Sequence, residues 1–290
     1  MSAPILVGIE RNERAAELVR AARSLALELG APLELVHVDE SAGEAPTDAR
    51  ERYARDTSAA ASDERADWAQ RLAQVLPPGE LDACLHLTSG KAAAALLRRA
   101  EELDARMLFL GAHTRRGLAH LGNTARELCA HGSRPVWVQS GPAAPVRRVL
   151  AAVDFSDLSL RALDRAQDLA RALGATLCVA HVHAVPAFAW GPNEAGEPGP
   201  GPNYVVEGER QAVRERLEQL VRERAEAGVE LEPRLLEGAP SEALAQEQAD
   251  LWVVGTHGRG AVGSLLLGSV AQNLLRRCSP VLVVPPAAAS

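Results

Sequence analysis

A glycine-rich segment in the second half of the chain has the residue types and the spacing that bind phosphate. Gly255 and Gly258 follow a short apolar run, and nine residues separate Gly258 from Gly268 and Ser269, where a helical pattern begins. Glycines let backbone N–H groups point at phosphate oxygens, and a helix N-terminus adds free donors with about half a positive charge. The segment therefore predicts an anion site in which Gly268 and Ser269 supply donors.

Asp154 ends another apolar run and is expected at the same sheet edge. Because like charges repel, its carboxylate does not suit a phosphate; it suits ribose hydroxyls or a bridging metal ion. The segment is not a P-loop, since the G-x-x-x-x-G-K-[ST] pattern does not occur and the single lysine, Lys91, lies in the other half. A glycine loop alone is as compatible with a tight turn at a strand end as with a binding site.

The elements that must position these residues occur twice, because the chain repeats itself with an offset of 144 residues. Residues 5–10 align with 149–154, and identical residues recur from Ala22 to Val38 and from Ala166 to Val182. A segment rich in Gly, Pro and Ala joins the two copies. We expect one domain over 1–140 and a second over 146–290.

Strands and helices alternate in each copy. In the second copy, short apolar runs predict buried strands over 149–153, 175–182, 231–236, 251–254 and 281–284. Ser156 is expected to cap the first helix and Gly174 to end it; further helices are expected over 207–226 and 241–248 and up to Arg277. The pattern predicts an α/β fold of two tandem doubly wound domains, each with a five-stranded parallel sheet flanked by helices.

Composition narrows the class of protein. The chain has 290 residues, 47% apolar and 24% charged, with a net charge of −7. These values fit a globular protein and argue against a nucleic-acid partner, and no apolar stretch is long enough to span a membrane. The N-terminus resembles a first strand rather than a signal peptide, and the four cysteines form no C-x-x-C. We expect a cytoplasmic protein with buried, reduced cysteines.

The glycine spacing resembles the G-2x-G-9x-G-[ST] nucleotide motif of the universal stress proteins. The resemblance extends to the Asp-Phe-Ser after 149–153, the His-Val ending of 177–182, Gly238-Ala-Pro and Pro280-Val-Leu-Val-Val. It covers nearly the whole chain, once per half, and so implies a tandem member whose halves pack as a pseudo-dimer. It also implies ATP or a related adenine nucleotide as cofactor, with or without Mg²⁺ or Mn²⁺, and dimerisation through the fifth strand, including a homodimer.

The resemblance assigns roles to residues of the second half. Asp154 would lie by the adenine and ribose, and Val182 would line the adenine pocket. The sugar and phosphates would be wrapped, mostly by backbone atoms, by Gly255, Thr256, His257, Gly258 and Arg259. The phosphates would be held by Gly268, Ser269 and Val270. No catalytic residue and no metal-ligating residue is expected.

The first half departs from the motif. Thr114 stands where the second half has Gly258, and the spacing from Gly111 to Gly122 is two residues shorter than that from Gly255 to Gly268. Asn123 replaces Ser269, and Glu10 replaces Asp154. Together these changes predict a first half that keeps its fold and has lost nucleotide binding.

We expect a nucleotide-binding protein of stress response or signalling, in which any ATP turnover is slow and not the main function. One alternative is a dimerisation scaffold with a vestigial nucleotide site. A second, less favoured, is an adenine-nucleotide α-hydrolase; such enzymes carry a glycine-rich loop after the first strand, where this chain has Asp154-Phe-Ser-Asp.

A histidine pair and a breaker-rich segment each allow a structural and a functional interpretation. His181 and His183 form only two of the three or four ligands that a metal site needs, so a structural role is favoured. The segment 186–204, rich in Gly and Pro, is expected to be a surface loop. The alternative is a lid that closes over the adenine base.

Overall fold

The structure, a computed structural model, describes residues 2–40, 59–115, 118–120, 122–183, 202–225, 228–258 and 267–286, without the side chains of 59–61, 113–120 and 202–207. The first half contains β1 (Ile5–Ile9), α1 (Ala15–Glu28), β2 (Leu33–Asp39), α3 (Ala59–Leu72), α4 (Pro78–Cys84), β3 (Leu85–Ser89), α5 (Ala92–Glu102), β4 (Met107–Gly111), β5 (His113–Arg115), β6 (Leu118–His120), α6 (Asn123–His131) and β7 (Val136–Gln139). The second half contains β8 (Arg148–Ala152), α7 (Asp157–Leu173), β9 (Thr176–His183), α8 (Pro202–Glu223), β10 (Leu231–Glu237), α9 (Pro240–Gln246), β11 (Leu251–Gly255), α10 (Ser269–Arg277) and β12 (Val281–Val284).

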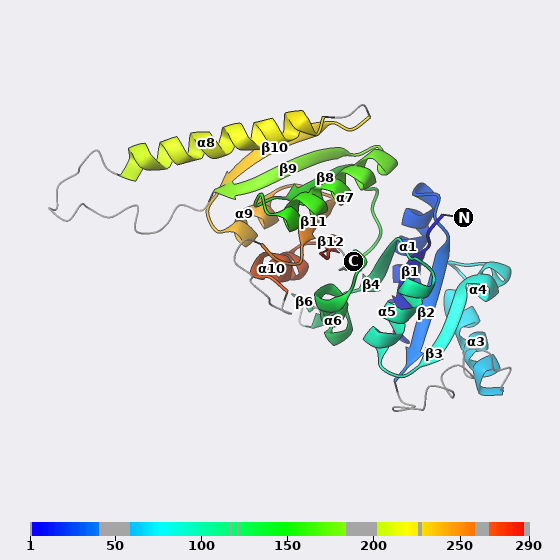
Figure 1. Cartoon of the computed structure of the whole chain (residues 1–290). Coiled ribbons are helices and arrows are strands. Elements are labelled where there is room, and N and C mark those ends of the chain that lie inside the picture. Colours follow the sequence, from blue (N-terminus) through cyan, green and yellow to red (C-terminus); the bar gives the residue numbers. More distant parts are fainter. Residues whose placement is uncertain are drawn as a thin grey trace.

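Ten strands form one sheet across both halves (Figure 1). Their order is β3-β2-β1-β4-β7 in the first half and β10-β9-β8-β11-β12 in the second, and all pairs within each half are parallel. The chain winds outward in both directions from its first strand, so the expected doubly wound α/β fold is confirmed. The strand order reverses between β1 and β4 and between β8 and β11, where such sheets bind ligands.

The two halves meet through their fifth strands. β7 and β12 pair antiparallel, with Trp137 opposite Leu282, and convert two five-stranded sheets into one. The intrachain pseudo-dimer implied by the resemblance is therefore present, and it engages one edge of each fifth strand.

A hydrophobic layer covers each face of the sheet. One layer contains apolar side chains of α1, α3, α4, α7 and α8, and the other contains those of α5, α6, α9 and α10. Each layer includes residues of both halves, so the sheet is buried on both faces, as its near-continuous apolar strands predicted. Among the described helices, none is long and apolar enough to cross a membrane.

The ends of α7 show how local sequence sets the element next to the site. The Ser156 side chain caps the helix by accepting a hydrogen bond from the Ser159 N–H, and Gly174 ends the helix in the left-handed region at φ 62°. Both positions are as expected from the sequence. The helix α8 differs, since it begins at Pro202, inside the segment expected to be a loop.

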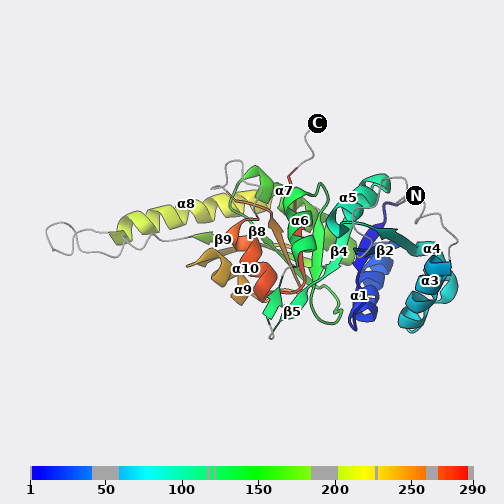
Figure 2. The same ribbon diagram turned by 90° about the horizontal axis from the view of Figure 1, so that it is seen from below.

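The segment after β4 has no counterpart among the described residues of the second half. β5 and β6 form a two-stranded antiparallel hairpin in which Thr114 pairs with Ala119. β6 contacts α10 of the other half, and Figures 1 and 2 both show the hairpin beside that helix. The first half thus places a hairpin where the second half has its glycine-rich segment.

Candidate functional site

Asp154 lies directly beyond the carboxyl end of β8, and the start of α7 holds it in place. Its Oδ1 accepts hydrogen bonds from the Ser156 N–H at 3.0 Å and the Ser156 Oγ–H at 2.5 Å. The Asp154 N–H donates to Ser159 Oγ at 3.2 Å. Ser156 therefore does two jobs, capping α7 and orienting the carboxylate, and only the second could not be read from the sequence.

The other carboxylate oxygen faces the glycine-rich segment. A Cβ on Gly258 would lie 2.6 Å from Asp154 Oδ2, closer than such atoms approach in proteins. A Cβ on Gly255 would lie 2.9 Å from Leu158 Cγ, and one on Gly268 would lie 3.1 Å from the Thr256 carbonyl oxygen. A side chain at Gly255 or Gly258 would therefore force its neighbour to move, a Cβ at Gly268 would make a tight contact, and at none of the three is a positive φ the reason.

Hydrogen bonds tie Thr256 to the start of α10 and to the end of β12. The Gly268 N–H donates to the Thr256 carbonyl oxygen at 2.7 Å, and the Thr256 N–H donates to the Val284 carbonyl oxygen at 3.1 Å. Gly268 is the N-cap of α10, so Ser269 and Val270 lie in its first turn, where N–H groups have no intrahelical acceptor. The structure therefore brings Asp154, Gly258 and the N-terminus of α10 to one edge of the sheet.

The structure gives fewer contacts for the remaining residues expected at the site. Val182 is half-buried near the end of β9, against the apolar layer that contains α9 and α10. Thr256 is buried, and its Oγ1 lies 3.1 Å from His257 Nδ1. Arg259 lies outside the described residues, as do residues 186–201 of the segment 186–204 for which a surface loop or a lid is expected. The roles of these residues in binding stay a prediction.

His181 is held by contacts with neighbouring protein groups. Its Nδ1 lies 2.7 Å from the carbonyl oxygen of Val153, and its ring lies 4.7 Å from that of Phe155. The Arg216 guanidinium, from α8, covers the same Phe155 ring at 4.3 Å. This stack joins α8 to the end of β8, and no pattern in the sequence pointed to it. Within the described part of the chain, no three His, Cys, Asp or Glu residues form a cluster that could hold a metal ion.

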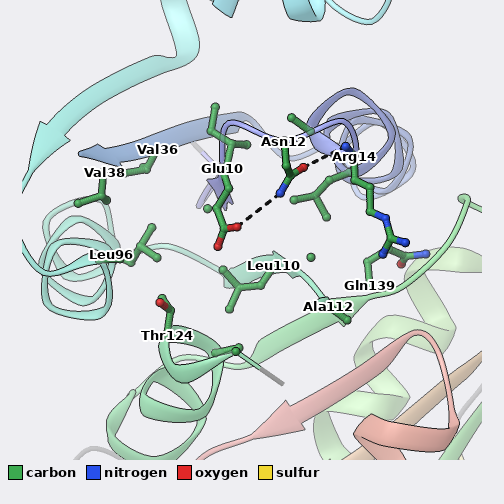
Figure 3. A pocket seen from close by; sticks show the side chains of 18 of the residues that line it. Glu10, Asn12, Arg14, Val36, Val38, Leu96, Leu110, Ala112, Thr124 and Gln139 are labelled. Atoms are coloured by element: carbon green, nitrogen blue, oxygen red, sulfur yellow. Dashed lines mark hydrogen bonds between the residues drawn. The ribbon is translucent and has the colours of Figure 1, made fainter. Parts of the chain in front are cut away.

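The equivalent edge of the first half carries a pocket of about 830 Å³ (Figure 3). It lies between the ends of β1, β2 and β4 and the start of α6, and Glu10 points into it. The Glu10 Oε2 accepts a hydrogen bond from Asn12 Nδ2 at 3.4 Å, and Asn12 Oδ1 accepts one from the Arg14 N–H at 2.9 Å. The sequence suggested a lost site here and gave no sign of an open pocket.

The four cysteines are free, and three of them are buried. Burial raises the pKa of the Cys129 thiol to about 12, and burial together with Glu34 and Glu80 raises that of Cys84 to about 11. These thiols are therefore protonated at neutral pH, which does not suit nucleophiles or metal ligands.

Comparisons with known proteins agree with this arrangement. The profile of the universal stress protein family matches residues 1–139 and again residues 145–285. A universal stress protein of Thermus aquaticus is 41% identical over 148 residues, which cover 48% of this chain and 98% of that protein. One from Methanocaldococcus jannaschii is 29% identical over 143 residues, covering 48% of this chain and 81% of that protein.

Two solved structures resemble the chain over nearly its full length. A universal stress protein from Archaeoglobus fulgidus gives a TM-score of 0.63 at 18% identity, covering 98% of this chain and 99% of that one. A protein of unknown function from Pseudomonas aeruginosa gives 0.64 at 19% identity, covering 98% and 92%. At these identities the likeness concerns the fold, whereas the double profile match concerns the family. The chain therefore belongs to the universal stress protein family, as a tandem member with two such domains.

Proposed function

We propose that the second half binds ATP or a related adenine nucleotide, between Asp154 and the N-terminus of α10. The observation that carries the proposal is the approach of Gly258 to Asp154, at which even a single Cβ would lie 2.6 Å from the carboxylate. A loop that only ended a strand would not need a glycine against a fixed carboxylate. The hydrogen bond from Gly268 to Thr256 keeps the end of β11 beside the first-turn N–H groups of α10.

The charges set the orientation of the nucleotide. The phosphates lie at the first turn of α10, where Ser269 and Val270 offer N–H groups and the helix dipole favours an anion. The Oδ2 of Asp154 accepts hydrogen bonds from ribose hydroxyls or contacts a phosphate-bound Mg²⁺ or Mn²⁺. The base then extends toward the end of β9, where Val182 lies. The first half, with a hairpin in place of the loop, does not bind this ligand.

The protein binds nucleotide and does not depend on turning it over. Arg276 and Arg277 are at the far end of α10 from the phosphates. Ser156, whose hydroxyl lies beside Asp154, is engaged by Asp154 and by the first turn of α7, so it does not suit the orientation of a water molecule on a transferring phosphate. In this account the bound nucleotide acts as a signal, and it changes what the protein docks with. Release of pyrophosphate from ATP would instead indicate an α-hydrolase.

The scaffold alternative is less well supported. It relies on association of chains through their fifth strands, yet β7 and β12 already pair with each other as well as with β4 and β11. Chromatography of the supernatant after denaturing purified protein distinguishes the two functions. Released adenine nucleotide supports the binding protein, and a nucleotide-free preparation that also fails to take up ATP supports the scaffold.

Gly258→Val tests the site directly. The side chain would displace Asp154 and the loop, so we expect ATP affinity to fall at least 100-fold by isothermal titration calorimetry, with an unchanged circular dichroism spectrum. The matched control is Thr114→Val in the first half, which preserves side-chain shape and leaves ATP binding unchanged. Retention of ATP binding by Gly258→Val would contradict the proposed site.

A further inference from the structure

The pocket of the first half has the size of a small-molecule site. Its volume of about 830 Å³ lies within the range of roughly 300–1,000 Å³ that is typical of ligand pockets. It occupies the reversal of strand order between β1 and β4, which is where doubly wound sheets bind ligands. The first half has therefore kept a cavity although it has lost the glycine motif.

One side of this pocket is apolar. Val36 and Val38 of β2, Leu96 of α5 and Leu110 of β4 face it together (Figure 3). Leu96 and Leu110 are buried in the layer that covers this face of the sheet, so this wall is fixed by packing. It offers an apolar ring or chain a preformed surface, and burial of such a group is favourable by about 25 cal/mol per Å².

The charged residues of the pocket are mostly acidic. Its described lining includes the carboxylates of Glu10, Glu13, Glu17 and Glu40 but only one basic side chain, that of Arg14. The N-terminus of α6 contributes about half a positive charge, which does not balance four carboxylates. The local potential is therefore negative, which disfavours a phosphorylated ligand and favours a cation.

Glu10 places a negative charge beside the apolar wall. It occupies the position of Asp154 but has one more methylene, and its side chain points into the pocket beside Leu110 (Figure 3). In the second half the carboxylate is instead directed at Gly258 by Ser156. The duplicated position thus carries a carboxylate in both halves, aimed at a glycine loop in one and into an open cavity in the other.

We propose that this pocket is a second ligand site, specific for a phosphate-free organic cation: an amine on an apolar ring or chain. The ring lies on the wall formed by Val36, Leu96 and Leu110, and the ammonium group lies among the glutamates with Glu10 as its nearest partner. The site is independent of nucleotide binding by the second half.

Three probes that share an indole ring and differ in charge test the proposal: tryptamine (cation), indole (neutral) and indole-3-acetate (anion). The full chain carrying Gly258→Val is used, so that the nucleotide site does not contribute, and affinities are taken from ¹H–¹⁵N chemical-shift titrations at low salt. We expect tryptamine to bind at least tenfold more tightly than indole-3-acetate, with indole between them. The resonances that shift should be those of β1, β2 and the start of α6.

Two variants connect the preference to the pocket. Glu10→Gln should weaken tryptamine binding severalfold and leave indole binding unchanged, because only the charge is removed. Glu101→Gln, an exposed position on α5 outside the pocket, is the matched control and should change neither. Equal affinity for the three probes, binding of none of them, or displacement of tryptamine by ATP from this chain would overturn the proposal. Since ATP binding is measured on the chain with an intact Gly258, failure here leaves the proposed function standing.

Discussion

The two halves of the chain share their strand order and helix layers, yet they differ at the carboxyl ends of the first and fourth strands. In the second half Ser156 turns Asp154 toward Gly258, and Gly268 at the start of α10 donates a hydrogen bond to the Thr256 carbonyl oxygen. In the first half the chain after β4 forms a hairpin against the other half, and a cavity with Glu10 remains. The sheet and its two apolar layers have been retained in both copies, while the residues beyond the strands have diverged in chemistry.

Two equivalent histidines, one in each half, likewise share one contact and differ in another. His37 and His181 occupy equivalent positions, and each Nδ1 lies within hydrogen-bond distance of the carbonyl oxygen that ends strand one, at 3.0 Å from Ile9 and 2.7 Å from Val153. Their outer neighbours differ. His37 contacts buried Glu64 of α3 at 3.3 Å, whereas His181 stacks on Phe155 under Arg216 of α8. The inner contact is retained and the outer contact has changed with the helix that covers it.

The largest difference between the halves should appear when proline replaces the first residue of α10, Ser269, or the first residue of α6, Asn123. Proline is tolerated at this position, and the extended backbone of Gly268 and Gly122 suits a following proline. Ser269→Pro removes an N–H and a hydroxyl from the phosphate site, so we expect ATP affinity to fall about 100-fold, or about 2.7 kcal/mol. Asn123→Pro in the first half should leave ATP affinity unchanged. Equal effects of the two substitutions, measured by calorimetry, would contradict the difference between the halves.

The outer contacts of the two histidines should differ in their contribution to stability. Glu64 is buried and pairs with His37 and Arg11, so Glu64→Gln should lower the free energy of unfolding by about 2 kcal/mol. Phe155→Leu, which removes the stack beneath Arg216 in the second half, should cost less, about 1 kcal/mol. Urea unfolding of both variants measures the difference. A larger loss for Phe155→Leu would show that α8 and not α3 is held by the stronger contact.

An effect confined to acidic pH is expected at the edge strand of the first half. Burial, assisted by Arg99, lowers the pKa of His86 on β3 from 6.5 to about 4. Between these values the unfolded chain binds a proton at this site that the folded chain does not, so the free energy of unfolding decreases as pH falls from 6.5 toward 4. His86→Gln should reduce the slope of stability against pH in this window. The exposed His131→Gln is the control, and an unchanged slope in His86→Gln would contradict the assignment.

Local and periodic signals predicted much of this molecule. The duplication, the five strands of each half, the Ser156 cap and the Gly174 end all follow from residue type and spacing, and the structure has them. The sequence also indicated that Thr114 and Asn123 depart from the glycine motif. These features depend on residues close together in the chain or on a repeat that can be aligned.

The features that could not be predicted depend on contacts between distant segments. Arg216 reaches Phe155 from α8, and the hairpin packs on α10 of the opposite half. The pocket around Glu10 is the space left between seven helices and strands, and no single segment encodes it. Such features arise only when the packed sheet brings the ends of separate strands together.

The stoichiometry of ATP binding tests the central claim, one nucleotide site in a chain of two equivalent folds, most directly. Isothermal titration of the full chain, freed of bound nucleotide, with ATP and Mg²⁺ measures it. We expect one ATP per chain, with no second binding phase of comparable affinity. Two ATP per chain of similar affinity, or no binding to nucleotide-free protein, would contradict it.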